Sequence, residues 1–180
     1  TLELCVQRYG RYALTTGSVI NQIGSIVYGQ GRYTESEQLT RVALDTMEKA
    51  GAAPNSVMIA FARRTLGWSL SAEEKWPEAL AAFKSMRAGV EGSPLIQRMG
   101  GGDVNWGYAM VKTGNAEGAA EMLKRDYETA LARTGDTDYQ TTVARGRYAV
   151  ALAAKGEQSE ALKQFALAVP ALRRPQQHDQ

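Results

Sequence analysis

The segment that comes nearest to a phosphate-binding loop is Arg98-Met99-Gly100-Gly101-Gly102-Asp103. A dinucleotide fingerprint needs GxGxxG spacing after a strand, and a P-loop needs Gly-Lys followed by Ser or Thr, because those patterns place backbone N–H groups around a phosphate. This segment has neither pattern. We therefore predict a connecting loop that ends in Asp103 as the N-cap of a helix.

The chain has one cysteine, Cys5, and one histidine, His178. A zinc site of Cys and His ligands, a Cys–His pair and a Ser–His–Asp triad all need more of these residues in the folded part. We predict that Cys5 is a small buried residue and that His178 lies in a solvated tail. Turn and helix-capping roles account for the acidic pairs without acid–base chemistry: Glu73-Glu74 and Asp136/Asp138. These residues predict no catalytic centre, no metal and no cofactor, so we do not expect an enzyme.

Composition narrows the function classes further. The 180 residues are 44% hydrophobic and 22% charged, as in one folded domain or one repeat array. The formal net charge of +2 favours neither a nucleic acid nor an anionic membrane as partner. No apolar run approaches the roughly 18 residues of a membrane span. The chain starts Thr1-Leu2-Glu3, without a Met, so we expect a piece of a larger protein. It starts without a signal-like apolar segment, so we expect a cytoplasmic protein. Its high Ala and Gly content favours a bacterial source.

An internal repeat organises the chain. A large apolar residue precedes a very small one in four places: Ile23-Gly24, Leu66-Gly67, Trp106-Gly107 and Tyr148-Ala149. We call the small residues the anchors, and they are 43, 40 and 42 positions apart. Seven positions after the anchors stand mostly turn formers, the turn column: Gly31, Glu74, Gly114 and Gly156. Small residues stand twelve positions after the anchors: Ser36, Ala79, Ala119 and Ala161. Sixteen positions after the anchors, three of the four residues are large and apolar, Thr40 being the exception: Thr40, Phe83, Leu123 and Phe165.

Each repeat is predicted to be a pair of helices. The anchor lets a second helix approach closely, the turn column ends the first helix, and the later apolar residue fills the space where the helices diverge. One pair cannot bury its own apolar face, so the array is stable only when pairs stack. We predict eight helices: 15–29, 34–50, 56–72, 77–89, 103–113, 116–133, 139–154 and 158–169. Residues 1–16 form a leading segment that contains a further helix or the remnant of an upstream repeat.

Local signals mark several helix starts. Thr34-x-x-Glu37 has the form of a capping box, and Thr137-x-x-Gln140 resembles one. Pro77 is expected as a first helical residue, and Asn115 as an N-cap. The four repeats are predicted over 17–55, 56–102, 103–136 and 137–169, followed by a flexible tail over 170–180.

This pattern resembles the tetratricopeptide repeat (TPR), in which a large residue precedes a Gly or Ala in the first helix and a Gly closes the turn. Gly31-Arg32-Tyr33 and Lys75-Trp76-Pro77-Glu78-Ala79-Leu80 are close to that pattern, and the resemblance covers about residues 17–169. The resemblance implies an all-α fold, a right-handed superhelix of about four antiparallel helix pairs. The period of 40 to 43 residues exceeds the usual 34, so the repeats are elongated and degenerate. In length they are similar to repeats in kinesin light chains and near bacterial caspase-like CHAT proteases.

The candidate binding surface is a stripe on the first helices. Residues three before, one after and four after each anchor share one side of a helix, which should line the concave face of the array. Aromatic, cationic and amide side chains of the kind that anchor partners fall on or beside this stripe: Asn21, Ser25, Tyr28, Arg64, Trp68, Asn105, Tyr108, Lys112 and Arg147. An alternative interpretation is that Trp68 and Tyr108 only pack between adjacent repeats.

Two functions follow as the main hypotheses, and a third is a purely structural array that self-assembles and holds no ligand in its groove. The first is a module that binds a peptide, a helix or a neighbouring domain in the concave groove. The alternative is the regulatory repeat region of an enzyme, such as a CHAT protease, whose catalytic domain lies outside this chain. The carboxylate-clamp pattern of some TPR proteins is not matched, so a chaperone C-terminal tail is not the expected ligand.

Overall fold

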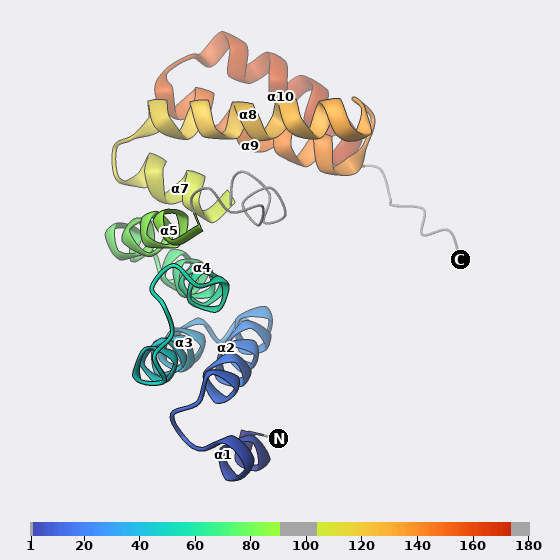
Figure 1. The fold of residues 1–180 in the computed structure, drawn as a ribbon. Coiled ribbons are helices and arrows are strands. Elements are labelled where there is room, and N and C mark those ends of the chain that lie inside the picture. The colour runs from blue at the N-terminus through green and yellow to red at the C-terminus, as the bar shows by residue number, and fades with distance from the viewer. Residues whose placement is uncertain (1, 91–103, 174–180) are drawn as a thin grey trace, which may run out of the picture. The chain divides into compact units, whose positions relative to one another are not determined.

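The computed structural model describes residues 2–90 and 104–173, and over these ranges the fold is all-α (Figure 1). The described residues form nine helices and no strand, in agreement with the sequence. The helices are α1 (Leu2–Tyr9), α2 (Leu14–Gly29), α3 (Tyr33–Lys49), α4 (Val57–Ala72), α5 (Trp76–Val90), α7 (Val104–Lys112), α8 (Ala116–Thr134), α9 (Tyr139–Lys155) and α10 (Gln158–Leu172). All eight expected helices are present, and most of their ends lie within one residue of the expected positions.

The turn column ends the first helix of every pair through a left-handed backbone conformation. Gly31, Gly114 and Gly156 have φ of 78°, 86° and 92°, values that glycine adopts without a Cβ penalty. Glu74 occupies the same place in the second pair with φ of 59°. It is the one non-glycine residue with positive φ among the described residues, so its turn has the glycine geometry without the glycine.

The anchors lie where the paired helices cross. A Cβ on Gly24 would lie 2.9 Å from Thr40 Oγ1, and a Cβ on Gly107 would lie 2.8 Å from Leu123 Cδ1. These close approaches join positions sixteen apart, as the sequence columns predict. The small residues twelve positions after the anchors are also fully buried, because they complete the crossing from the second helix: Ser36, Ala79, Ala119 and Ala161.

The chain forms two compact bodies, residues 1–99 and residues 100–180. In the N-terminal body α2 pairs with α3 and α4 with α5, while α3 and α2 both contact α4. In the C-terminal body α8 packs between α7 and α9, and α10 packs on α9. Within each body the inner second helix, α3 or α8, therefore contacts the first helix of the following pair, which is how stacked pairs share one core.

Two of the predicted helix caps are wrong. The helix at Thr34 begins earlier, with Arg32 as N-cap and no side-chain cap bond, because Glu37 is engaged by cations instead of the backbone. The cap of α9 is Asp138 rather than Thr137, and its carboxylate accepts from the backbone N–H groups of Gln140 and Thr141. The Asn115 cap is confirmed, since its side chain accepts from Gly118 N. Pro77 is the second residue of α5 rather than the first.

The leading segment forms a helix, α1, that packs on α2, as one of the two expectations for it required. The other end of the array differs from expectation. The last helix does not stop at residue 169 but continues through Pro170 to Leu172, and the Arg173 backbone N–H donates to the Val169 carbonyl oxygen at 3.1 Å. The glycine-rich segment with Asp103, and the tail residue His178, lie outside the described residues.

Candidate functional site

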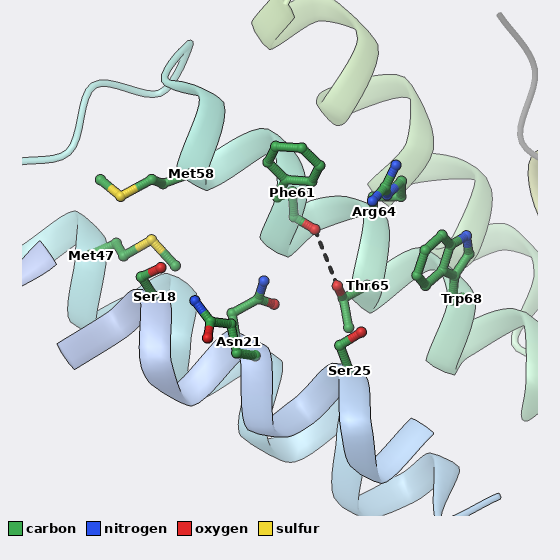
Figure 2. Close-up of a pocket in the computed structure, with 10 residues that line it drawn as sticks. Ser18, Asn21, Ser25, Met47, Met58, Phe61, Arg64, Thr65 and Trp68 are labelled. Atoms are coloured by element: carbon green, nitrogen blue, oxygen red, sulfur yellow. Dashed lines mark hydrogen bonds between the residues drawn. The ribbon is translucent and has the colours of Figure 1, made fainter. Parts of the chain in front are cut away.

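A pocket of about 280 Å³ lies between α2 and α4 in the N-terminal body (Figure 2). Four of the predicted groove residues line it: Asn21, Ser25, Arg64 and Trp68. Six more complete the lining: Ser18, Gln22, Met47, Met58, Phe61 and Thr65. The two first helices meet here because both present the side of the helix that flanks their anchors, as the stripe argument requires.

One wall of the pocket is aromatic and cationic. The Arg64 guanidinium lies 4.8 Å from the centre of the Phe61 ring and 4.7 Å from that of Trp68. Residues three before and four after Arg64 are its neighbours on the surface of α4, so the spacing places one ring on each side of the cation. These two contacts hold the guanidinium of Arg64 at the pocket.

The aromatic wall extends beyond Arg64. The Tyr28 ring centre is 5.8 Å from that of Trp68, and the Tyr33 ring centre is 5.4 Å from that of Tyr28. Tyr28 is therefore joined to the pocket through Trp68, although it is not one of the lining residues. Trp68 packs against Tyr28 of the preceding pair and also lines the pocket. A partner-binding role for Trp68 stays a prediction.

The opposite wall is polar and comes from α2. Figure 2 shows Ser18, Asn21 and Ser25 on α2 facing α4 across the pocket. Within the part of the chain that the structure describes, Asn21 Oδ1 is buried and accepts no hydrogen bond. The Thr65 hydroxyl, by contrast, donates to the Phe61 carbonyl oxygen at 3.2 Å within its own helix. The pocket thus has an amide with unused hydrogen-bonding capacity beside it.

The remaining predicted residues belong to the C-terminal body. Tyr108 and Arg147 meet at a shallow hollow of about 10 Å³ between α7, α8 and α9, which is too small for a ligand. Tyr108 is 40% exposed and Lys112 is exposed, while Asn105 is half-buried on α7. Each body is compact by itself, so a groove that continues from one body to the other stays a prediction.

Part of the pocket lining lies outside the predicted stripe. Ser18 and Phe61 each stand six positions before an anchor, one turn earlier on the same side of the helix as Asn21 and Arg64. Extending the stripe by one turn would have found both. Met47 comes from α3 and Met58 from the start of α4, and no periodicity of the first helices indicates that these methionines meet at the pocket.

Ion pairs between the repeats hold α3 against the second pair. Glu37, on α3, accepts from Lys75 Nζ at 2.7 Å and from Arg41 Nε at 2.7 Å. Burial alone would raise the pKa of Glu37, but the hydrogen bonds from Lys75 and Arg41 outweigh burial and lower it below its usual value. In the C-terminal body Asp136, expected at a turn, pairs with the buried Arg145, which also donates to the Tyr127 hydroxyl at 2.8 Å.

The described residues offer little for other chemistry. Cys5 is half-buried, where full burial was expected, and its Sγ lies 3.8 Å from Thr16 Oγ1. No group of three or more His, Cys, Asp or Glu side chains gathers there in a way that could hold a metal ion. Among the same residues, every helix is too short or too polar to cross a membrane.

Comparison with known proteins gives the fold. No protein-family profile matches the sequence, and neither does any curated protein. A crystal structure of a candidate kinesin light chain of Podosopora anserina, with nearly identical TPR-like repeats, matches with a TM-score of 0.67 and 13% identity. That match covers 88% of this chain and 74% of the other. A second crystal structure of the same description matches with a TM-score of 0.66 and 14% identity over 91% and 77% of the two chains. The resemblance to the repeats near CHAT proteases stays a prediction. With its recurring columns, its crossed helix pairs and these structural matches, the chain has a TPR-like helical-repeat fold.

Proposed function

We propose that this chain is a protein-interaction module, and that its N-terminal body holds a segment of another protein in the pocket between α2 and α4. The observation that carries the proposal is the pair of walls described above. A guanidinium that lies beside two aromatic rings of α4 faces the serine and amide side chains of α2. This combination can bury an apolar side chain and hydrogen-bond the backbone beside it.

The size of the pocket supports a protein segment over a cofactor. Pockets for drug-sized ligands measure about 300–1,000 Å³ and are mostly enclosed. At about 280 Å³ the pocket lies at the lower limit of that range. It suits one large apolar side chain, placed against Met58, Phe61 and Trp68, with the peptide backbone lying along the polar wall.

Charge indicates the kind of segment. Arg64 is the one charged residue among the ten described lining residues, so the lining carries a positive charge and no carboxylate. A guanidinium beside two rings can still donate N–H groups to carbonyl or carboxylate oxygens of a partner. A rotation of the Asn21 carboxamide would let a peptide N–H satisfy its buried oxygen. The partner is therefore a segment with an apolar side chain flanked by oxygen acceptors. We propose a second contact area in the C-terminal body, formed by the other predicted groove residues: Tyr108, Lys112, Asn105 and Arg147.

The test begins with peptides selected from a displayed random library on the intact chain. Affinities of the selected peptides are then measured by fluorescence anisotropy. We expect Arg64→Ala and Asn21→Ala each to weaken binding by about fivefold or more, the effect of losing more than about 1 kcal/mol at a hot spot. Thermal melts confirm that both variants remain folded.

Neighbouring residues provide matched controls. Arg63 precedes Arg64 on α4 but donates to the carbonyl oxygens of Pro54 and Ser85, away from the pocket. Gln38 is an exposed amide on α3. Arg63→Ala and Gln38→Ala should bind the peptides like the unaltered chain. Equal binding by the two pocket variants, or an equal loss in the two controls, would show that the peptides bind elsewhere.

A further inference from the structure

Two methionines meet at one end of the pocket between α2 and α4. Met58 extends from the first turn of α4 and Met47 from the last turn of α3, and both line the pocket. Figure 2 shows their sulfur atoms, in yellow, at the opposite end of the pocket from Trp68. Met58 also packs on the core cluster that contains Met47 and Ile59. Thioether side chains therefore form part of the apolar end of this pocket.

The five described methionines differ in their access to solvent. Met47, Met86 and Met122 are buried, whereas Met58 and Met110 are partly exposed. Met110 lies on α7 in the C-terminal body and does not line the pocket. A thioether must be reached by a peroxide before it can be oxidised. Of the two methionines that line the pocket, Met58 is therefore the one that a dissolved oxidant can reach.

We propose that Met58 is an oxidation-sensitive site, and that hydrogen peroxide releases a bound segment by converting the Met58 thioether to a sulfoxide. This inference rests on the proposed binding of a protein segment in the pocket. The thioether sulfur attacks one peroxide oxygen, and the S–O bond forms as the O–O bond breaks. The proton of the transferred oxygen passes to the departing hydroxide, which leaves as water. Sulfur is thus oxidised by two electrons and the peroxide is reduced by two.

The sulfoxide changes the apolar end of the pocket into a polar one. Its S–O group is a strong dipole that accepts hydrogen bonds from water. An apolar side chain of the bound segment, placed against Met58 and Phe61, would remove those hydrogen bonds, which makes binding less favourable. In the unbound chain the oxygen stays hydrated, because Met58 is partly exposed. Oxidation should therefore weaken binding and leave the fold intact.

The first test compares peptide affinity before and after treatment with peroxide. The reference chain carries Cys5→Ser and Met99→Leu, because Cys5 is a second oxidisable group and Met99 lies outside the described residues. A selected peptide without methionine or cysteine is titrated by fluorescence anisotropy. Each variant is compared with itself before oxidation, so the readout is the ratio of two dissociation constants. We expect a ratio of at least about five for the reference chain and of about one for Met58→Leu.

Met110→Leu is the matched control, because Met110 is the other partly exposed methionine among the described residues. Its ratio should equal that of the reference chain. A methionine sulfoxide reductase with dithiothreitol should restore the affinity, since it returns the sulfoxide to the thioether. The proposal is overturned by an equal loss of binding in Met58→Leu. It is also overturned if mass spectrometry shows Met58 as sulfoxide while the affinity is unchanged.

The second test follows the oxidation itself by mass spectrometry of proteolytic fragments. In the unbound chain Met58 should oxidise faster than the buried Met47. A saturating peptide should slow the oxidation of Met58 at least about fivefold and leave the rate at Met110 unchanged, because only Met58 is covered. A Met58 that oxidises at the same rate with and without bound peptide contradicts the inference.

The Arg64→Ala assay separates this inference from the proposed function. If Arg64→Ala weakens binding but the oxidation ratio of the reference chain is one, the role of Met58 is refuted and the pocket stands. If Arg64→Ala and Asn21→Ala both bind like the unaltered chain, the pocket is refuted, and release through Met58 with it.

Discussion

Replacing Gly67 by alanine tests the helix crossing at the centre of the second pair. Gly67 is buried in α4, and an added Cβ would lie 2.6 Å from Phe83 Cε1, 2.7 Å from Cζ and 2.9 Å from Cδ1. Ordinary contacts at such a Cβ are 3.4–4 Å, so the ring must move by several tenths of an ångström or more. Phe83 is fully buried, and every direction of movement meets packed atoms.

The expected cost is the balance of two effects. Overpacking a well-packed core destabilises by about 1–3 kcal/mol. Alanine in a helix interior, in contrast, is favoured over glycine by about 0.5–1 kcal/mol. The net loss in the free energy of unfolding should be about 1–2 kcal/mol, which lowers the urea midpoint by roughly 0.5–1 M for an m-value near 2 kcal/mol/M.

Urea unfolding followed by circular dichroism measures this loss, and Gly146→Ala is the matched control. Gly146 is also inside a first helix, but its added Cβ would meet Ala168 Cβ at 3.8 Å and Leu172 Cδ1 at 4.0 Å, both comfortable contacts. This variant should therefore be more stable than the unaltered chain, by about 0.5–1 kcal/mol. Glycine to alanine should thus lower the free energy of unfolding at Gly67 and raise it at Gly146.

A double-mutant cycle tests whether contact with Phe83 causes the loss of stability in Gly67→Ala. Phe83→Leu removes the ring atoms that the new Cβ would meet. It should therefore lower the free energy of unfolding less in the Gly67→Ala background than in the unaltered chain, with a coupling energy of about 0.5–3 kcal/mol. If Gly67→Ala unfolds at the same urea concentration as the unaltered chain, or if the cycle shows no coupling, the assigned crossing of α4 and α5 is wrong.

Two further changes test other parts of the repeat. Glu74→Gly should raise the melting temperature, because it removes a left-handed non-glycine residue that costs about 1–2 kcal/mol, partly offset by the greater freedom of glycine in the unfolded chain. A lower melting temperature would exclude strain at this turn. The low pKa of Glu37 in the folded chain predicts stability that is present above its unfolded value of 4.5 and is lost as the pH falls through the folded pKa. Unfolding measured on acidification should therefore show a smaller loss for Glu37→Gln than for the unaltered chain, and equal losses would refute this role.

The repeat register could be predicted from the sequence because it follows from local sterics. A close helix crossing requires a residue such as Gly67 or Ala79, and a left-handed helix end favours one such as Gly114. Each requirement is visible in residue type alone, and recurrence at similar spacing sets the pairing. For this reason the helices and their crossings agree with expectation.

The misplaced caps and the pocket depend on contacts between distant residues. Glu37 matched a capping box by spacing, but Lys75, 38 positions away, binds its carboxylate instead. Similarly, the stripe predicts the side of α4 on which Arg64 lies, but the contacts of Arg64 with Phe61 and Trp68 depend on rotamers that the stripe does not define. Met47 reaches the pocket from α3, which a pattern based on first helices does not consider.

The most direct test of the proposed function uses fluorotryptophan as a reporter. Trp68 lines the pocket, whereas Trp106 lies on α7 in the C-terminal body. Fluorine NMR of the labelled chain, with signals assigned by Trp→Phe variants, can be followed while a selected peptide is added. We predict that the Trp68 signal shifts in proportion to the bound fraction given by anisotropy, while the Trp106 signal moves less. A peptide that saturates the chain and leaves the Trp68 signal unmoved would contradict binding in the pocket between α2 and α4.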